Sequence, residues 1–250
     1  MSAPRRTLVI GARGALGAAV CGALRGRGGV VHGLDLPEVD LSEAGSLEPA
    51  LRAAWAEHGP FDALVYAAGV FPARAALLST ETLFDRVFAV NTRGALLAGT
   101  TAAELAIAAG RPLTVVALSS GAAQQARPGT VVYAASKAAL EALIRGLALE
   151  LGPRGVRFNA VAPGFVDVGS TVNPVPEAYV RALAELSPHG RVATASDILP
   201  VVLWLLSAES HWVSGQVLRA DGGAGLGSLS APSWLPGPAE TDAPPARPER

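Results

Sequence analysis

Cysteine and charge are both scarce in this sequence. Its 250 residues include one cysteine, Cys21, which cannot form an internal disulfide and lies among small apolar residues, where a packed thiol is expected. This predicts a reducing compartment, and we expect a cytoplasmic protein. Only 16% of the residues are charged and the formal net charge is −1, so no electrostatic feature indicates nucleic acid or an anionic membrane as a partner.

Long hydrophobic runs and spaced metal ligands are also lacking. The apolar segment 7–24 is interrupted by Arg13 and by glycines, which excludes it as a membrane span, and it lacks the three-part pattern of a secretory signal. Half of the residues are nonetheless hydrophobic, enough for the core of a compact globular enzyme. We expect no metal site, because the histidines are scattered without ligand spacing, at His32, His58, His189 and His211.

What the sequence does contain is an alternation of short apolar runs with longer helical stretches. It predicts six strands, at residues 7–12, 30–35, 62–69, 113–120, 156–164 and 216–223. It predicts helices at about residues 15–27, 46–57, 80–109, 134–152 and 196–207. Several runs are apolar without alternation, as in strands buried on both faces. The expected fold class is therefore α/β, with a single doubly wound parallel sheet and right-handed crossovers.

Two stretches depart from this alternation. Only four residues separate Asp35 from Asp40, whereas a crossover that includes a helix needs at least about ten. We therefore expect a shortened third strand and crossover, with two to four strand residues near Glu38–Leu41 or none. From about Ala224 the chain is rich in proline, alanine and charge. This predicts one domain over residues 1–223 and a C-terminal tail over 224–250, the last part of it disordered.

A glycine-rich turn lies between the first predicted strand and the first predicted helix. Gly11, Gly14 and Gly17 would let backbone amides approach a pyrophosphate at the helix N-terminus, which predicts dinucleotide binding. Asp35, which ends the second strand, is placed to accept hydrogen bonds from ribose hydroxyls and to repel a 2′-phosphate. Asp35 favours NAD over NADP, whereas Arg13 in the loop could pair with that phosphate. Because the third strand is short, we expect an unusually exposed adenine.

The stretch "VVYAASKAALEAL", residues 131–143, places Tyr133 four positions before Lys137. On a helix the two side chains share a face. A neighbouring ammonium would favour the phenolate and lower the pKa of the tyrosine, which is about 10 in a free side chain. Taken alone, the two residues are either a tuned acid–base pair or two polar residues on an alanine-rich helix.

The glycine loop, "YAASK" and "RFNAVAPG" together give the sequence a resemblance to the short-chain dehydrogenase/reductase family, over residues 8–223. The loop "GARGALG" resembles the G-x-x-G-x-x-G loop of dihydropteridine reductase, and the remainder is more similar to ketoreductases and dihydrodiol dehydrogenases. "SPHGRVATASDI" resembles the P-x-G-R segment of the family, and "GQVLRADGG" resembles its last strand. The resemblance implies a Rossmann-type sheet and four matched catalytic residues, Asn91, Ser120, Tyr133 and Lys137.

The resemblance also implies a cofactor site, with two departures from the family pattern. Tyr66-Ala67-Ala68-Gly69 stands where the family usually has N-N-A-G, so the asparagine hydrogen bonds that tie the sheet are lost, while Gly69 still borders the nicotinamide ribose. Val168 stands where a threonine commonly holds the carboxamide, and Ser170 or Thr171 would have to substitute. The implied cofactor-binding positions are Gly11, Arg13, Gly14, Ala15, Leu16, Asp35, Asp40, Leu41, Ala68, Gly69, Tyr133, Lys137, Pro163, Gly164 and Val166.

In function, the resemblance implies an NAD-dependent enzyme that interconverts a secondary alcohol and a ketone. Ser120 would hydrogen-bond the substrate oxygen while Tyr133 acts as general acid/base. Lys137 would lower the pKa of Tyr133 and hold the ribose, and Asn91 would anchor a water that relays the proton. Two alternatives stay open: an NADPH-dependent ketoreductase with the same site, and a non-catalytic dinucleotide-binding regulatory protein.

A small-molecule substrate should lie under residues 165–186. Phe165, Val172, Val175 and Tyr179 in that segment indicate a mainly apolar substrate. Polar residues on other loops are expected to be mostly solvated surface, namely Arg74, Gln124, Gln125 and Arg127.

The helix at residues 134–151 is expected to be apolar on two sides. One face, which would cover the sheet, carries Leu140, Leu143, Ile144, Leu147 and Leu151. A second face carries the small residues Ala135, Ala139, Ala142 and Gly146 together with Leu149. Glu141 and Arg145 should form a narrow polar strip between the two faces. The second face needs a cover, which predicts a homotetramer or homodimer that pairs through this helix and the helix at 80–109.

Overall fold

Six parallel strands form one sheet in the computed structural model, which describes residues 6–125, 127–169 and 175–227. Their order across the sheet is β2-β1-β3-β4-β5-β6, and every neighbouring pair is parallel. The strands are β1 (Arg6–Ile10), β2 (Val30–Leu34), β3 (Ala63–Tyr66), β4 (Leu113–Leu118), β5 (Val156–Pro163) and β6 (Val217–Ala220). Each overlaps one predicted strand, which confirms the single parallel sheet of Rossmann type.

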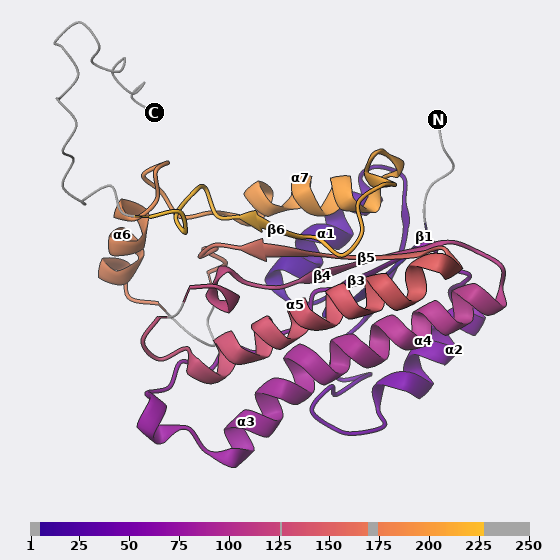
Figure 1. The fold of residues 1–250 in the computed structure, drawn as a ribbon, viewed down its shortest axis with the longest axis horizontal. Coiled ribbons are helices and arrows are strands. Elements are labelled where there is room, and N and C mark those ends of the chain that lie inside the picture. The colour runs from indigo at the N-terminus through magenta and orange to yellow at the C-terminus, as the bar shows by residue number, and fades with distance from the viewer. Residues whose placement is uncertain (1–5, 126, 170–174, 228–250) are drawn as a thin grey trace, which may run out of the picture.

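Helices cover both faces of this sheet (Figure 1). One face carries α2 (Leu47–His58), α4 (Gly94–Ala108) and α5 (Val131–Leu151), and the other carries α1 (Ala15–Arg25) and α7 (Ala195–Leu206). The helix α6 (Glu177–Glu185) lies beyond the carboxyl ends of the strands. None of the helices in the described ranges is long and apolar enough to cross a membrane.

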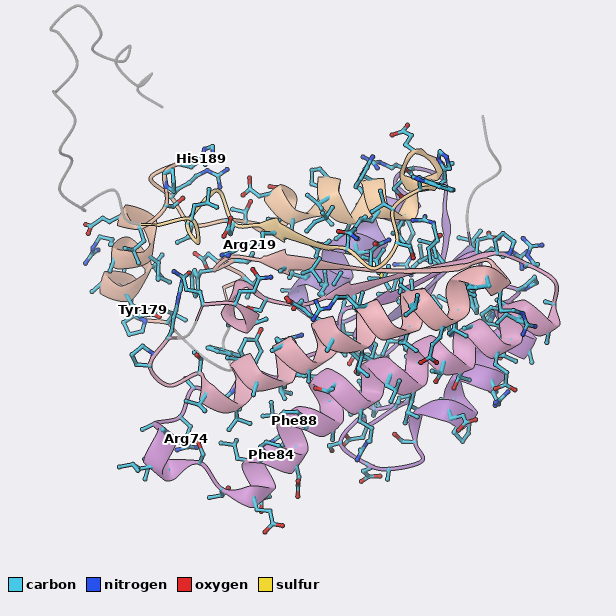
Figure 2. The ribbon with its side chains drawn as sticks, viewed as in Figure 1. Arg74, Phe84, Phe88, Tyr179, His189 and Arg219 are labelled. Carbon is cyan, nitrogen blue, oxygen red and sulfur yellow. The ribbon has the colours of Figure 1, made fainter. Side chains whose placement is uncertain are left out.

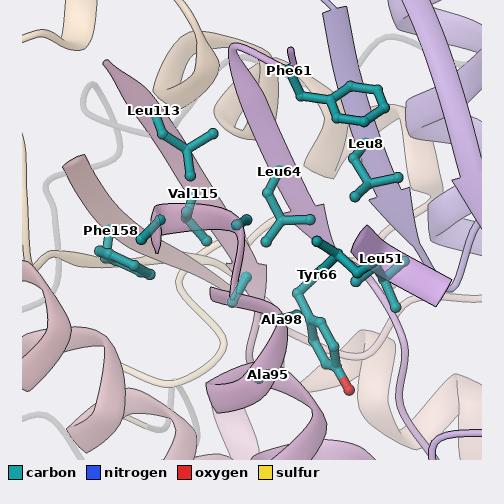
Figure 3. Packing of buried hydrophobic residues seen from close by; sticks show 14 of the residues in the cluster. Leu8, Leu51, Phe61, Leu64, Tyr66, Ala95, Ala98, Leu113, Val115 and Phe158 are labelled. Atoms are coloured by element: carbon teal, nitrogen blue, oxygen red, sulfur yellow. The ribbon is translucent and has the colours of Figure 1, made fainter. Parts of the chain in front are cut away.

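The two faces of the sheet bury two separate apolar clusters. Along β1, Leu8 and Ile10 point into the cluster beneath α2, α4 and α5, whereas Val9 between them points into the cluster beneath α1 and α7. This follows from the two-residue period of a strand, and it explains why the buried strands are apolar throughout. Figure 3 shows the first cluster, in which the rings of Phe61 and Phe158 fill opposite ends.

Small side chains let α4 lie close to the sheet. Ala95, Ala98, Ala102 and Ala106 are buried and are spaced three or four residues apart, so they share one face of the helix. At Gly99, an added Cβ would stand 2.9 Å from the ring of Phe158. The alanine-rich composition of this helix is therefore a packing requirement of the interior.

The long helix predicted over residues 80–109 contains a π-helical turn. The structure has α3 (Glu81–Phe88), a π-helical turn at Ala89–Arg93 and then α4. Asn91 lies inside this π-turn, and its side chain is bound to the backbone of Val70. A π-turn inserts residues into a helix without ending it and is often found at functional sites. The helical path predicted for this segment is therefore present over residues 81–108, but the π-turn in it was not predicted.

The segment after β2 is as short as the spacing of Asp35 and Asp40 predicted. Residues 35–46, all of them described, contain neither a strand nor a helix. Of the two outcomes expected near Glu38–Leu41, a short strand or none, the structure has none. β2 is therefore an edge strand. Arg93 holds the segment in place by donating hydrogen bonds to the carbonyls of Leu41 and Ser42, at 3.3 and 3.1 Å.

The strand order brings the predicted site residues to one edge. From β1 the chain moves to β2 on one side and then returns to β3 on the other side of β1. Such a reversal leaves a crevice outside the carboxyl ends of the strands, where open α/β sheets bind their ligands. The disordered part of the tail predicted after residue 223 falls on residues 228–250, outside the described residues.

Candidate active site

Three elements bring the four predicted catalytic residues to this edge. Tyr133 and Lys137 lie one turn apart in the first part of α5. Ser120 follows the carboxyl end of β4, where it begins a short 3₁₀ turn (Gly121–Ala123) and accepts a hydrogen bond from the amide of Ala122 at 3.2 Å. Asn91 comes from the π-turn before α4.

The ammonium of Lys137 is buried, with 3% of the residue exposed. Its Nζ donates a hydrogen bond of 2.7 Å to the carbonyl of Leu118, the last residue of β4, and lies 5.9 Å from the centre of the Tyr133 ring. Burial lowers the pKa of Lys137 to about 8, and the charge of Glu141 opposes this shift. Lys137 is thus still mostly protonated at neutral pH, but it loses its proton at a lower pH than an exposed lysine does.

Tyr133 does not have the lowered pKa that the sequence predicted. Burial raises the pKa of its hydroxyl above the usual value, and a hydrogen bond with Ser120 acts in the opposite direction. In the chain alone, desolvation outweighs the effect of this hydrogen bond. The tyrosine is therefore a protonated phenol, ready to donate, and the ring of Phe71 packs edge-on against it with centroids 4.7 Å apart.

Asn91 is fully buried, and its side chain is held from three directions. Its Oδ1 accepts a hydrogen bond from the Val70 amide at 2.8 Å, and its Nδ2 donates to the Val70 carbonyl and to Ser136 Oγ, both at 3.0 Å. Ser136 in turn donates to the Tyr133 carbonyl at 2.7 Å. Asn91 thus ties the loop after β3 to α5, and its role in a proton relay stays a prediction.

Glu141 is not on a polar surface strip, as the helical wheel suggested, but is buried, with 5% of the residue exposed. Its Oε1 accepts a hydrogen bond from Ser119 Oγ at 2.8 Å and its Oε2 accepts one from Gln124 Nε2 at 3.4 Å. The helix is rotated so that the row formed by Tyr133, Lys137 and Glu141, four residues apart, faces the end of β4. That spacing is the signal that could have revealed Glu141 in the sequence.

The glycine turn after β1 is built from close backbone contacts. Gly11 has a φ of +82°, and a Cβ at this position would collide with the backbone of Ala68 in the turn after β3. A Cβ at Gly17 would collide with the carbonyl oxygen of Gly11. Glycine is therefore required where Gly11 approaches the turn after β3 and where the start of α1 approaches Gly11. The first backbone amides of α1 face this turn and can bind an anion.

Asp35 holds the neighbouring turn at the end of β2. Its two carboxylate oxygens accept hydrogen bonds from the backbone amides of Arg13 and Leu36, at 2.7 and 2.8 Å. The guanidinium of Arg13 forms an exposed ion pair of 2.6 Å with Glu38. A cavity of about 300 Å³ adjoins this turn and is lined by Ala12, Arg13, Ala18, Cys21, Arg25, Gly33 and Asp35.

The other expected cofactor positions follow the carboxyl ends of the strands. Ala15 and Leu16 open α1, Asp40 and Leu41 lie in the segment after β2, and Ala68 and Gly69 follow β3, while Pro163, Gly164 and Val166 lie at or after the end of β5. At Gly69, an added Cβ would stand 3.5 Å from both Asn91 Oδ1 and Lys137 Nζ. Because Gly69 has no side chain, the space next to the ammonium of Lys137 stays open.

The two departures from the family pattern have different outcomes. The asparagine hydrogen bonds of the N-N-A-G sequence are absent. Tyr66, the last residue of β3, supplies a different link: its buried hydroxyl donates a hydrogen bond of 2.5 Å to the carbonyl of Val90 in the π-turn. Val168 is 41% exposed. Ser170 and Thr171, named as substitutes for its missing hydroxyl, lie outside the described residues, as does Val172 of the predicted substrate segment.

Aromatic and polar side chains border the open side of the site. Phe165 and Tyr179 lie edge to face, with centroids 6.5 Å apart. Figure 2 shows Tyr179 and Arg219 at the same end of the sheet, where Arg219 pairs with Asp221 at 2.7 Å. Arg219 also donates to Gln124 Oε1 at 3.4 Å. Gln124 is exposed, as expected, and through this bond and the one to Glu141 it joins α5 to the end of β6.

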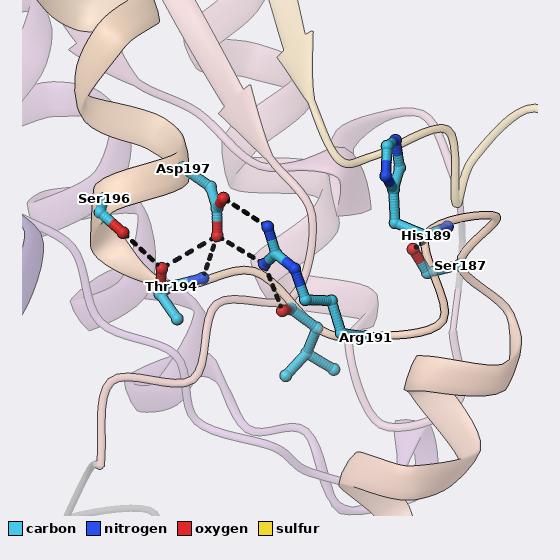
Figure 4. Close-up of polar contacts among 7 residues, drawn as sticks. Ser187, His189, Arg191, Thr194, Ser196 and Asp197 are labelled. Carbon is cyan, nitrogen blue, oxygen red and sulfur yellow. Dashed lines mark hydrogen bonds and ion pairs between the residues drawn. The ribbon is translucent and has the colours of Figure 1, made fainter. Parts of the chain in front are cut away.

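The segment that resembles P-x-G-R holds the start of α7 (Figure 4). Arg191 binds the carboxylate of Asp197 through two nitrogens, each at 2.7 Å. Asp197 in turn accepts hydrogen bonds from the amide and the hydroxyl of Thr194, the N-cap residue. Arg191 therefore helps to fix the start of α7, which follows the segment predicted to cover the substrate.

Comparisons with known proteins agree with this geometry. A family model described as enoyl-(acyl carrier protein) reductase matches residues 18–225. D-erythrulose reductase of Gallus gallus is 35% identical over 234 residues, which cover 88% of this chain and 95% of the relative. L-xylulose reductase of Mesocricetus auratus is 34% identical over 236 residues, with 88% and 96% covered. A chloroplastic NADPH-dependent aldehyde reductase-like protein of Arabidopsis thaliana is 33% identical over 189 residues, with 74% and 70% covered. The chain belongs to the short-chain dehydrogenase/reductase family.

Proposed function

We propose that this chain is an NAD(H)-dependent oxidoreductase that interconverts a secondary alcohol and a ketone, with Tyr133 as the general acid/base. Family membership by itself makes the chain an NAD(P)-dependent oxidoreductase that acts on CH–OH groups. The observation that carries the proposal is the meeting of Ser120, Tyr133 and Lys137 at the end of β4. They lie beside glycine turns whose backbone suits a dinucleotide.

The residues present fit such a cofactor, which supplies or accepts the hydride when it is bound. The glycine turn and the first amides of α1 would hold its pyrophosphate. Lys137 has three N–H donors, of which one binds the carbonyl of Leu118, so two remain for ribose hydroxyls. Gly69 leaves room for them beside the ammonium.

Proton transfer belongs to the protein. In ketone reduction, the Tyr133 hydroxyl donates its proton to the carbonyl oxygen as that oxygen gains negative charge, and Ser120 donates a hydrogen bond to the same oxygen. The phenolate left on Tyr133 is stabilised by the ammonium of Lys137. In alcohol oxidation the phenolate accepts the proton. The raised pKa of Tyr133 in the chain alone favours the donating form.

The preference for NAD over NADP rests on Asp35. Its carboxylate is fixed by two backbone amides at the end of β2, where it would meet a 2′-phosphate with like charge. Arg13, which could favour the phosphate, is already paired with Glu38. An NADPH-dependent reductase is the second candidate, and the relative from Arabidopsis thaliana, named for NADPH, favours it.

Two substrate classes are open to the same site. The rings of Phe71, Phe165 and Tyr179 favour a mainly apolar ketone or alcohol. The relatives named for erythrulose and xylulose favour a short polyhydroxy ketone instead. We therefore propose the apolar class first and treat the polyhydroxy class as its direct competitor.

Turnover at the NADH absorbance band tests these points together. Apolar ketones, short ketoses and the corresponding alcohols should be offered with NADH, NADPH and their oxidised forms at one ionic strength. We expect activity with NAD(H) and tighter binding of NADH than of NADPH. Faster turnover with NADPH would overturn the preference for NAD. Cofactor binding without turnover of any substrate would leave the regulatory alternative.

A homo-oligomer, in the cytoplasm, completes the proposal. Ala135, Ala142, Gly146 and Leu149 form an exposed apolar face on α5; Leu149 is 80% exposed, and an added Cβ at Gly146 would meet nothing within 4 Å. A second copy placed across a two-fold axis would cover it.

Sedimentation at micromolar concentration tests the assembly. We expect a dimer or tetramer, and Ala142→Arg should split it, because the long cation would stand at the centre of the covered face. Ala208→Arg, on an exposed residue after α7, is the matched control and should leave the assembly intact. A single species near 25.3 kDa for the unmodified chain would contradict the oligomer.

A further inference from the structure

Three residues of α5, each four positions from the next, contact consecutive residues at the end of β4. Lys137 Nζ binds the carbonyl of Leu118 at 2.7 Å, and Glu141 accepts a hydrogen bond from Ser119 Oγ at 2.8 Å. The third residue, Tyr133, is near enough to Ser120 for its hydroxyl to lower the pKa of the phenol. Two hydrogen bonds therefore fasten the helix to the two residues that precede Ser120.

Glu141 is the member of this row that the proposed mechanism does not use. It is 5% exposed, although a buried carboxylate costs free energy unless it is paired or well hydrogen-bonded. Both of its oxygens accept hydrogen bonds, from Ser119 and from Gln124, as suits the ionised form, which only accepts. A buried negative charge thus lies one helical turn from the buried ammonium of Lys137.

Other charged side chains on the elements that pack against α5 are bound elsewhere or exposed; among them, Glu104 of α4 pairs with Arg52, and Arg154 after α5 is exposed. Arg93 of the π-turn donates to the carbonyls of Leu41 and Ser42, and Arg157 of β5 donates to those of Ser210 and Val213. Charged residues of α3, namely Glu81, Asp85 and Arg86, are exposed. On the side of β6, Arg219 reaches Glu141 only through Gln124 and is itself paired with Asp221.

We propose that Glu141 is a positioning residue for the active site, which fixes the strand end that carries Ser120 and supplies the negative charge that balances the buried ammonium of Lys137. The hydrogen bond to Ser119 sets the backbone immediately before the catalytic serine. The charge acts through space, along the same face of α5. This inference rests on the proposed function of Lys137, but its principal test does not need turnover.

The chain itself provides the probe, because Lys137 is the only lysine among its 250 residues. With lysine labelled by ¹³C at Cε, a single side-chain signal reports the titration of this ammonium by NMR. The unmodified chain should titrate near pH 8. Glu141→Gln keeps an acceptor for Ser119 but removes the charge, and the midpoint should fall by on the order of one pH unit.

Matched variants separate the charge from the hydrogen bond. Glu150→Gln removes a charge from an exposed position of the same helix and should leave the midpoint unchanged. Ser119→Ala keeps the charge and should also leave the midpoint unchanged, but it should lower kcat about tenfold with little change in KM, because the strand end loses its anchor. Glu141→Asp keeps a carboxylate that is too short for Ser119, so its midpoint should stay near that of the unmodified chain while kcat falls.

Each outcome bears on the inference. An unchanged midpoint in Glu141→Gln, or an equal fall in Glu150→Gln, overturns the role of the charge. An unchanged kcat in Ser119→Ala overturns the positioning of the strand end. If Glu141→Gln does not fold, as judged by circular dichroism, a fall of the midpoint in Glu141→Asp overturns the role of the charge instead. If the unmodified chain shows no oxidoreductase activity, the proposed function is contradicted, whereas the NMR titration still tests the charge of Glu141.

Discussion

Charged side chains gather at two places along the carboxyl edge of the sheet, and the two clusters are built in opposite ways. Beside β4, Lys137 and Glu141 are 3% and 5% exposed. After β2, the side chains of Arg13 and Glu38 are 58% and 51% exposed, although they form an ion pair of 2.6 Å. Water and salt screen the outer pair, whereas charges in the interior act through a medium of lower dielectric constant.

The comparison shows that a short distance between two charged groups does not measure how strongly they affect stability or pKa values. The outer ion pair contributes little free energy, as exposed pairs generally do. In the inner cluster, burial lowers the pKa of Lys137 to about 8, even though the charge of Glu141 opposes the shift. We therefore expect substitutions in the inner cluster to change rates by orders of magnitude, and those in the outer cluster to change cofactor choice by a smaller factor.

The largest effect should come from Tyr133→Phe, which removes the hydroxyl that transfers the proton. We expect kcat to fall by about 10³-fold or more, with the dissociation constant of NADH nearly unchanged. The other two tyrosines are matched controls: Tyr179→Phe should retain activity, and Tyr66→Phe should lower the melting temperature through the lost hydrogen bond to Val90. Retention of most activity in Tyr133→Phe would rule out the acid/base role.

Ser120→Ala should have the next largest effect. It removes one donor to the substrate oxygen, and a fall in kcat of about 10²-fold is expected. The same change removes the hydrogen bond from the Ala122 amide, so a melting curve must show that the fold is kept. Activity close to that of the unmodified chain would mean that Ser120 does not touch the reacting oxygen.

In the outer cluster, Asp35→Ala should narrow the preference for NADH over NADPH by about tenfold, which corresponds to about 1.4 kcal/mol. The ratio of the two dissociation constants is the measurement, and higher ionic strength should reduce the effect of the substitution, because the site is open to solvent. Glu43→Gln, in the exposed turn that follows, serves as the control. An unchanged ratio in Asp35→Ala would remove the argument for NAD.

The smallest effect should come from Asp197→Asn. This substitution breaks the capping box of α7, which lies away from both clusters. The loss of about 1 kcal/mol should lower the melting temperature by about 2–4 °C without changing kcat. Arg191 and Thr194 hold the pKa of Asp197 below its usual value. Its contribution is therefore present above about pH 4 and is lost as the pH falls, so the two chains should melt alike in acid. Glu177→Gln, in an exposed pair with Arg181, should change neither quantity.

The sequence was sufficient for the strands and for most of the helices. Runs such as "TLVIGA" are too apolar and too short to be anything but buried strands, and the glycines after them mark the turns. The spacing of Asp35 and Asp40 also predicted the missing crossover. These features depend on local composition and chain length, which are visible in a single sequence.

The features that were missed depend on contacts between distant segments. The π-turn forms where Asn91 binds the backbone of Val70, and no local pattern announces it. Glu141 was placed on the surface because a helical wheel does not show which way the helix is turned against the sheet. The raised pKa of Tyr133 likewise comes from burial, which the spacing to Lys137 does not reveal.

Having one lysine, and that one buried, also decides how the protein can be handled. Crosslinkers directed at lysine find no accessible ε-amine, so lysine side chains would not contribute a crosslink between the subunits of an oligomer. Carboxyl- or arginine-directed reagents are needed instead. All other positive side chains, histidine aside, are arginines, which keep their charge at any pH at which the chain stays folded. In alkaline solution, the cationic side chain that changes its charge is therefore Lys137, in the proposed active site.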